Sequence, residues 1–181
     1  MAQQGSAPER GLLERLDEGY VLVAEGYLFE LERRGYLQAG TFVPEVVLEH
    51  PEALAQVHRE FVRAGSDVIE AFTYYGHREK LRVIGKQELL EPLNRQALQL
   101  AHQVAAEFPD DPPLVAGNLA NTNVYEAGDA TIAAEVRAMF DEQARFAAEG
   151  SADYVVGETF YYLGEARIAL QAMREVGLPT V

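Results

Sequence analysis

Four short runs of apolar residues, rich in β-branched side chains, are the strongest constraint on how this chain folds. They read YVLVAEG at 20–26, DVIEAF at 67–72, PLVAGN at 113–118 and DYVVGET at 153–159. Each run has the length of a strand, and its nearly continuous apolar character is typical of strands buried on both faces of a sheet. The runs therefore predict four core strands, separated by segments long enough for helices.

Segments with helical periodicity fill the gaps between these runs. The predicted helices cover 28–35, 51–64, 89–108, 130–149 and 164–177. Two of them carry terminal signals. Pro51 occupies the first helical position with Gly65 just past the end, and Asp129 is placed to cap a helix that Gly150 stops. Strand and helix thus alternate along the chain, which predicts βαβ units and a parallel sheet.

The number of units narrows the fold class. Four βα units are complete, and LPTV at 178–181 has the character of the start of a fifth strand. No G-x-G-x-x-G or G-x-x-x-x-G-K-[ST] motif occurs, so a nucleotide-binding Rossmann or P-loop sheet is not supported. We expect an α/β fold that forms the N-terminal half of a (β/α)8, or TIM, barrel over residues 11–181, preceded by a disordered tail at 1–10.

Charge and composition limit the partners. The chain has 29 Asp and Glu against 15 Lys and Arg, a formal charge of -14, which repels nucleic acid and anionic membranes. No apolar run approaches the roughly 20 residues of a membrane span, and MAQQGSAPER is unlike a signal peptide. We therefore expect a cytoplasmic protein with no nucleic-acid or membrane partner. With no cysteine, the chain has no thiolate nucleophile and no cysteine metal ligand.

Carboxylates follow three of the predicted strands, at Glu25, Glu70 and Glu158. In a parallel α/β barrel the active site forms at these carboxyl ends. Carboxylates neutralise an ammonium group, and the aromatic rings that follow them attract methylated cations through cation–π contacts. An aromatic ring after a strand more often packs between sheet and helix, so each ring also has a structural interpretation. We expect functional roles for Glu25 and Glu158, and an outward, structural position for Glu70.

The histidines give weaker signals. No compact metal-binding spacing links them. His58 and His102 lie in amphipathic helices and are interpreted as solvated residues, and His77 is assigned to the surface of a strand-end loop. The basic residues around it are interpreted as a solvated loop. Three asparagines after the third run could bind a polar substrate or satisfy the loop backbone, namely Asn118, Asn121 and Asn123.

A long block of sequence carries a family resemblance. LVAEGYLFELERRGYLQAGTFVPEVVLEHPEALAQVHREFVRAGSDVIEAFTYYGHREKL resembles the N-terminal part of the homocysteine S-methyltransferase family, nearest to its betaine-homocysteine branch. GNLANTN and GETFYYLGEA fall at that family's third and fourth strand ends. The resemblance implies a barrel that transfers a methyl group from betaine, or a related methylated cation such as S-methylmethionine, to the thiol of homocysteine, which yields methionine.

The resemblance also implies binding residues. Glu25 and Gly26 match the acidic-Gly pair that contacts homocysteine, and Glu158 matches the glutamate after the fourth strand. Phe42, Phe72, Tyr74 and Tyr75 fall where the betaine branch places the aromatic residues of its methyl-donor site. Thr73 is also expected to bind substrate. Departures occur where the family usually has other residues: Glu25 replaces aspartate, Tyr27 a second glycine, Val43 a threonine, and Thr159 a tyrosine. The bulk of Glu25 and Tyr27 is expected to narrow the pocket, so the identity of the methyl donor stays open.

In this family, zinc held by three cysteines binds the homocysteine thiol, and those cysteines lie in later strands. This chain has none of them, so we expect a truncated half without catalytic residues or a metal site of its own, inactive alone. Its barrel edges would be exposed, which invites homo-oligomers. Two alternatives stay open: a non-catalytic half-barrel that works as a binding or assembly module, and an unrelated barrel enzyme that uses Glu25 and Glu158 as acid and base.

Overall fold

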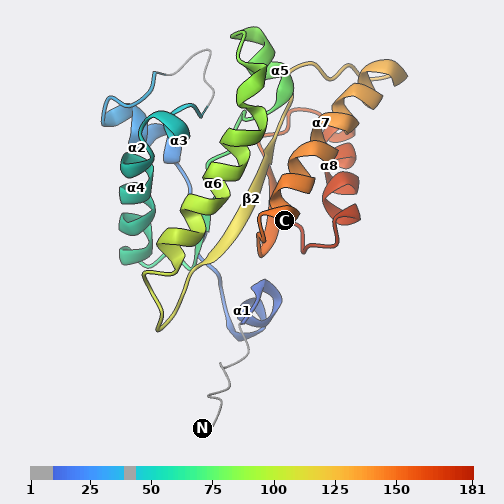
Figure 1. Cartoon of the computed structure of the whole chain (residues 1–181). Helices are drawn as coiled ribbons and strands as arrows, with labels where there is room; N and C mark the ends of the chain where they lie inside the picture. The colour runs from blue at the N-terminus through green and yellow to red at the C-terminus, as the bar shows by residue number, and fades with distance from the viewer. Residues whose placement is uncertain (1–9, 39–43) are drawn as a thin grey trace, which may run out of the picture.

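A small parallel sheet forms the centre of the computed structural model, which describes residues 10–38 and 44–181 (Figure 1). Its strands are β1 (Val68–Glu70), β2 (Leu114–Ala120) and β3 (Tyr154–Glu158), in the order β1-β2-β3. Both neighbouring pairs are parallel, and the register sets Glu70 beside Ala116 and Asn118 beside Val156. Parallel strands require long crossover connections, and the helices between the apolar runs supply them.

Two further segments extend this sheet at its edges. Val23 forms a parallel bridge with Val68, and the Ala24 amide donates to the Val68 carbonyl at 2.9 Å. At the other edge Thr180 bridges Val155, and the Val181 amide donates to the Val155 carbonyl at 3.0 Å. The predicted first strand is therefore present as a single bridge, and the predicted start of a fifth strand pairs where a barrel requires it.

Alternate residues of the strands point to opposite faces of the sheet. Val68, Leu114 and Tyr154 form a cluster on the inner face, where Leu12 of α1 (Leu12–Glu18) covers them. Ile69, Val115 and Val155 point outward into the main core beneath the helices. A sheet with apolar residues on both faces and helices on the outer one is the architecture of a partial (β/α)8 barrel, as the spacing predicts.

The helices form the outer layer, and α6 and α7 pack directly on β2 (Figure 1). The remaining bounds are α2 (Tyr27–Arg33), α3 (Val46–Glu49), α4 (Pro51–Arg63), α5 (Arg78–Val83), the 3-10 helix η1 (Gln87–Leu89), α6 (Leu90–Ala105), α7 (Ala130–Glu149) and α8 (Leu163–Glu175). Asp129 caps α7, since its carboxylate accepts from the Thr131 and Ile132 amides. Gly117 allows α7 to approach β2, because a Cβ there would lie 2.5 Å from the Ala147 Cβ.

The five predicted helices are present within three residues of the expected bounds. The basic segment after His77 differs from the expectation, because it forms α5 rather than a loop.

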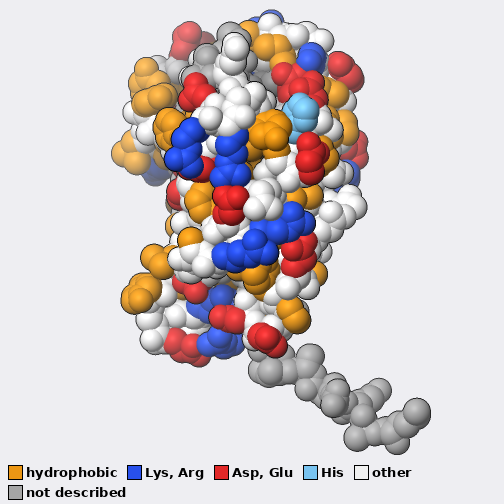
Figure 2. Space-filling model, turned by 90° about the vertical axis from the view of Figure 1, so that its left-hand side faces the viewer, with side chains coloured by type: hydrophobic (Ala, Val, Ile, Leu, Met, Phe, Trp, Pro, Cys, Tyr) orange, Lys and Arg blue, Asp and Glu red, His pale blue; other side chains and the backbone are white. Residues whose placement is uncertain are grey.

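Over the side of the molecule that carries α2 and α4, positive and negative side chains lie next to one another (Figure 2). They include the pairs Arg59–Glu107 at 2.7 Å and Arg34–Glu60 at 2.5 Å. Across the described residues, no helix combines the length and apolarity needed to cross a membrane. Phe42, Val43 and most of the predicted tail lie outside those residues.

Candidate functional site

A cavity of about 260 Å³ opens at the carboxyl ends of the first four strand segments. Its lining combines carboxylates with aromatic and aliphatic side chains. The residues are Glu25, Gly26, Tyr27, Leu28, Phe29, Glu70, Ala71, Phe72, Tyr74, Asn118, Glu158 and Thr159. The cavity thus lies where a parallel barrel places its ligand, and it unites residues that are up to 134 positions apart in the sequence.

Three carboxylates converge in this cavity. One oxygen from each of Glu25, Glu70 and Glu158 lies within 4.8 Å of the other two. Asn118 from the middle strand braces two of them, because its Nδ2 donates to Glu158 at 2.5 Å and to Glu70 at 3.2 Å. Glu70 is 3% exposed, so its expected outward position is wrong. It belongs to the inner face because it follows Val68 by two residues, and that alternation was the signal in the sequence.

Burial and mutual repulsion alter the acidity of this cluster. Burial raises the pKa of Glu70 well above 4.5, and the charges of Glu25 and Glu158 raise it further. The pKa of Glu158 is also raised, first by burial and then by Glu25, against the hydrogen bond from Asn118. No Lys, Arg or His lines the cavity among the described residues. The site therefore stabilises a bound cation or, when empty, a proton.

The turn after Glu25 fixes the first wall of the cavity. Gly26 has φ 82°, a left-handed conformation that glycine adopts without strain, and it begins α2. Tyr27 then points into the core, where its hydroxyl lies 3.0 Å from His58 Nδ1 and accepts from the Glu70 amide at 3.2 Å. His58 is fully buried, which corrects its assignment as a solvated residue, and burial lowers its pKa to about 3. Helical periodicity alone cannot show that a neutral histidine packs inward.

The expected donor-site residues separate into two groups. Phe72 and Tyr74 line the cavity with the glutamates. Thr73 is buried beside it, and its hydroxyl donates to the Asn118 carbonyl at 3.0 Å. Tyr75 stacks on Tyr74 with ring centroids 4.2 Å apart, and its position is constrained by φ 60°. The adjacent pair therefore places one ring in the cavity and the other behind it.

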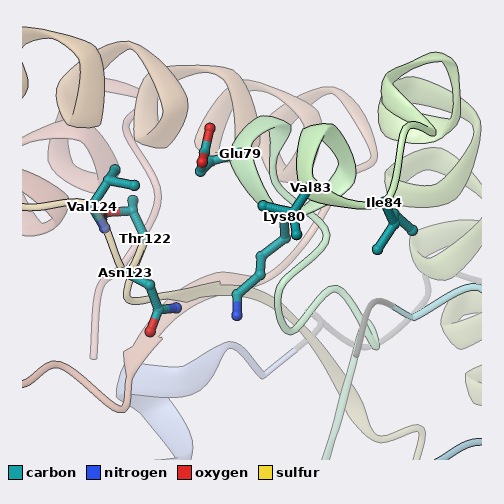
Figure 3. A pocket seen from close by; sticks show the side chains of 7 residues that line it. All are labelled: Glu79, Lys80, Val83, Ile84, Thr122, Asn123 and Val124. Carbon is teal, nitrogen blue, oxygen red and sulfur yellow. Dashed lines mark hydrogen bonds between the residues drawn. The ribbon is translucent and has the colours of Figure 1, made fainter. Parts of the chain in front are cut away.

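A second cavity of about 150 Å³ lies between α5 and the segment that follows β2 (Figure 3). Lys80 reaches toward Asn123 in Figure 3, and its Nζ lies 4.0 Å from the centroid of the Tyr75 ring. Burial opposes ionisation of Tyr75, but hydrogen bonding to Tyr74, Asn123 and Asn121 and the Lys80 charge outweigh it and lower the pKa. Lys80, a cation of the chain itself, therefore already makes a cation–π contact with the Tyr75 ring.

His77 corrects another expectation. It is 1% exposed, not on the surface, and its Nδ1 accepts from the Lys80 amide as the cap of α5. Burial lowers its pKa to about 4, with a smaller effect from Lys80. By contrast, Tyr161 and Tyr162 after β3 are 71% and 53% exposed and line neither cavity. Adjacent tyrosines in the sequence are therefore not sufficient to mark a site.

The residues do not fit a zinc site built on thiolates. The chain contains no cysteine. Within the described ranges, Glu25, Glu70 and Glu158 are the only group of three or more His, Cys, Asp or Glu residues with converging ligand atoms. Zinc that activates a thiol is held mainly by sulfur and nitrogen, whereas this cluster offers only carboxylate oxygens.

Fold and site together define a partial parallel barrel with an acidic, aromatic-lined cavity at its strand ends. The family model for homocysteine S-methyltransferase matches residues 24–181. The chain belongs to the homocysteine S-methyltransferase family.

Individual relatives agree with this assignment. The chain is 37% identical over 184 residues to betaine–homocysteine S-methyltransferase 1 of Xenopus tropicalis, a match that covers 99% of this chain and 44% of the relative. It is 38% identical over 182 residues to S-methylmethionine–homocysteine S-methyltransferase of Mus musculus, with 99% and 47% covered. The chain thus spans less than half the length of these relatives.

A solved structure supports the fold. The metallated form of the homocysteine methyltransferase MmuM from Escherichia coli superposes with a TM-score of 0.76 over 91% of this chain and 62% of that chain, at 20% identity. The expected barrel family is therefore confirmed.

Proposed function

We propose that this chain supplies the homocysteine-binding and donor-binding walls of a homocysteine S-methyltransferase. The observation that carries the proposal is the convergence of Glu25 and Glu158, the two residues expected to hold homocysteine, in one cavity with Phe72 and Tyr74. Family membership supports the reaction class, and the activities of the relatives support betaine or another methylated cation as donor.

The chemistry divides between the two kinds of lining residue. Carboxylates of Glu25 and Glu158 accept hydrogen bonds from the homocysteine ammonium and fix the amino acid at the strand ends. The Phe72 and Tyr74 rings hold the methylated cation, each contact contributing about 0.5 to 2 kcal/mol. Methyl transfer to the homocysteine thiolate then forms a carbon–sulfur bond, while the bond between the methyl carbon and the nitrogen or sulfur of the donor breaks. The products are methionine and the demethylated donor. Holding both partners in line is the contribution of this chain.

Thiol activation is not assigned to these residues, since the described part holds no sulfur or nitrogen cluster for zinc. We expect no methionine from the 181-residue chain alone.

Binding of substrates to the isolated chain tests the proposal. L-homocysteine and betaine are titrated into the isotope-labelled chain, and the amide shifts of cavity residues are followed. Glu25→Gln and Glu158→Gln are each expected to weaken homocysteine binding about tenfold or more, because a charged hydrogen-bond partner is lost. Glu52→Gln, an exposed glutamate of α4, is the matched control. If neither ligand perturbs the cavity, the proposed function is wrong.

Two alternatives are separable from this proposal. The acid–base enzyme requires Glu25 and Glu158 in one pocket, and that condition is met, so the pocket alone does not separate the two hypotheses. The family match argues against an unrelated barrel enzyme. The assembly module is favoured by apolar side chains exposed on α1 and the segment after it, namely Leu13, Leu16, Tyr20 and Leu22. Sedimentation equilibrium of the chain and of Leu16→Glu tests it. A dimer that the substitution dissociates would support self-association.

A further inference from the structure

Glu70 is a carboxylate that the proposed function leaves without a role. It is buried, lines the same cavity as Glu25 and Glu158, and comes from β1 beside the middle strand. Its Oε2 accepts from Asn118, but its Oε1 receives no hydrogen bond from the described residues. Its other close neighbours are the carboxylates of Glu25 and Glu158, which accept hydrogen bonds unless they share a proton with Glu70. When these carboxylates are ionised, Oε1 of Glu70 is a buried acceptor that an N–H group of a ligand can satisfy.

The three oxygens lie close enough together to form a tripod around one nitrogen. Charge-assisted N–H···O bonds are about 2.8 Å long, so three acceptors in tetrahedral directions around an ammonium lie about 4.6 Å apart. The observed oxygens are no more than 4.8 Å apart. A primary ammonium carries three N–H donors, one for each carboxylate. Resting on the proposed function, we infer that Glu70 is a third ammonium ligand, and that the cluster selects a primary ammonium over N-methylated amines.

The surroundings of the cluster support a cationic ligand of this kind. The titratable groups that face Glu70 are Glu25, Glu158, Tyr27 and Tyr154, none of which brings a positive charge at neutral pH. Asn118 joins Glu70 to Glu158 through one amide nitrogen, so the two side chains are held in place before a ligand arrives. Aromatic residues line the same cavity as the three carboxylates.

Protonation gives the inference a second consequence. Burial and the neighbouring carboxylates favour the protonated form of Glu70, whereas an arriving ammonium favours its ionised form. Primary amines should therefore bind more tightly as pH rises through the titration of the cluster.

A series of amines tests the tripod in the full 181-residue chain. Propylammonium, N-methylpropylammonium and tetramethylammonium offer three, two and no N–H donors, and L-homocysteine is titrated beside them. Amide shifts of cavity residues give the affinities. Wild type is expected to prefer the primary over the secondary amine about tenfold, because the secondary amine leaves one carboxylate unpaired. In Glu70→Gln that preference falls to near one. Repeating the titrations over a series of pH values is expected to show a larger gain in primary-amine affinity with rising pH for wild type than for Glu70→Gln.

Each outcome bears on one claim. An unchanged preference in Glu70→Gln, with homocysteine binding still dependent on Glu25 and Glu158, overturns the tripod and leaves the proposed function intact. Amine binding that depends on Glu70 without homocysteine binding supports the tripod and overturns the proposed function. No binding of any amine or of homocysteine overturns both. Mn²⁺ that binds the cluster more tightly than the amines also overturns the tripod. If Glu70→Gln does not fold, equal affinities of the wild-type chain for the primary and the secondary amine overturn the tripod.

Discussion

Two segments of this molecule begin alike and end differently. Asp67–Gly76 and Asp153–Gly164 both start with an aspartate whose carboxylate accepts from the preceding strand segment. Asp67 accepts from the Leu22 amide at 2.8 Å, and Asp153 from the Val115 amide at 2.7 Å. In both, a glutamate then points into the cavity. The similarity between the two passages is therefore a structural repeat at the start of the strand, where backbone pairing is the same.

The segments diverge after the glutamate because their spacing differs by one residue. The tyrosine pair starts four residues after Glu70 but three residues after Glu158. The backbone turns left-handed at Tyr75 in the first segment and already at Thr159 in the second. One tyrosine pair consequently lies at the cavity and the other is exposed. The comparison teaches that a shared motif predicts a shared strand, whereas the turn that follows decides which rings reach the ligand.

The largest expected difference concerns the phenylalanines of the two segments. Phe72 is 4% exposed and lies 5.8 Å from the Tyr27 ring, so Phe72→Ala should lower the free energy of unfolding by about 3 to 5 kcal/mol. Phe160 is partly exposed and makes an edge contact with Phe140 at 5.9 Å. Phe160→Ala should cost less. Urea denaturation of both variants measures the difference, and equal losses would contradict the distinction between the segments.

Two buried glutamates give the next difference, with opposite signs. Glu165 of α8 accepts from the Thr122 amide at 2.7 Å and from its hydroxyl at 2.6 Å. Glu165→Gln should therefore lower the free energy of unfolding by about 1 to 3 kcal/mol. Glu70→Gln should raise it at neutral pH, because the carboxylate is poorly satisfied. Denaturation curves at pH 7.5 test the pair, and destabilisation by both changes would contradict the role of Glu70 as a ligand site.

The pH dependence follows from the sign of the Glu70 shift. Its pKa in the folded chain lies above the unfolded value of 4.5, so its favourable contribution is complete below pH 4.5 and is lost as pH rises through the folded pKa. The advantage of Glu70→Gln should thus appear above pH 4.5 and grow with pH. His58 and His77 act oppositely, since their lowered pKa values remove stability as pH falls below 6.5. Subtracting the free energy of unfolding of wild type from that of Glu70→Gln at each pH isolates the contribution of Glu70.

The smallest expected difference concerns the two tyrosine pairs. Tyr74→Leu removes an aromatic face from the cavity and should weaken betaine binding about tenfold. Tyr161→Leu is the matched change in the exposed pair and should leave betaine affinity unchanged. Titrations followed by amide shifts compare them. A comparable loss in Tyr161→Leu would place the donor elsewhere on the strand-end face.

Local patterns predicted the scaffold because each one has a direct physical cause. Apolar runs became β1, β2 and β3 since they are buried on both faces, and Asp129 starts α7 because its carboxylate satisfies free amides. The family resemblance supplied Glu25 and Glu158 for the cavity. The first run pairs less than expected, because among the described residues a single bridge, at Val23, links it to β1.

Burial of polar side chains was the part that local patterns could not predict. His58 lies on a helix whose periodicity leaves its direction open, and it is buried because Tyr27 from another segment contacts it. His77 caps α5, a helix too short to show a period. The alternation after Val68 indicates the face of Glu70, but its contact with Asn118, 48 residues away, required the strand register. The contacts of His58 and Glu70 thus join distant segments, whereas that of His77 is local.

The unequal pairing along the sheet has a consequence for local opening. β2 pairs along both of its sides, whereas each outer neighbour of β1 and β3 is joined through a single bridge. Amide hydrogens of β2 are exposed to exchange only when most of the structure unfolds, while those of the bridges at Val68 and Val155 exchange through small fluctuations of the edges. We therefore expect hydrogen exchange to give two different opening free energies for neighbouring strands. Asn118, which braces the carboxylates, lies on β2, the strand expected to exchange more slowly.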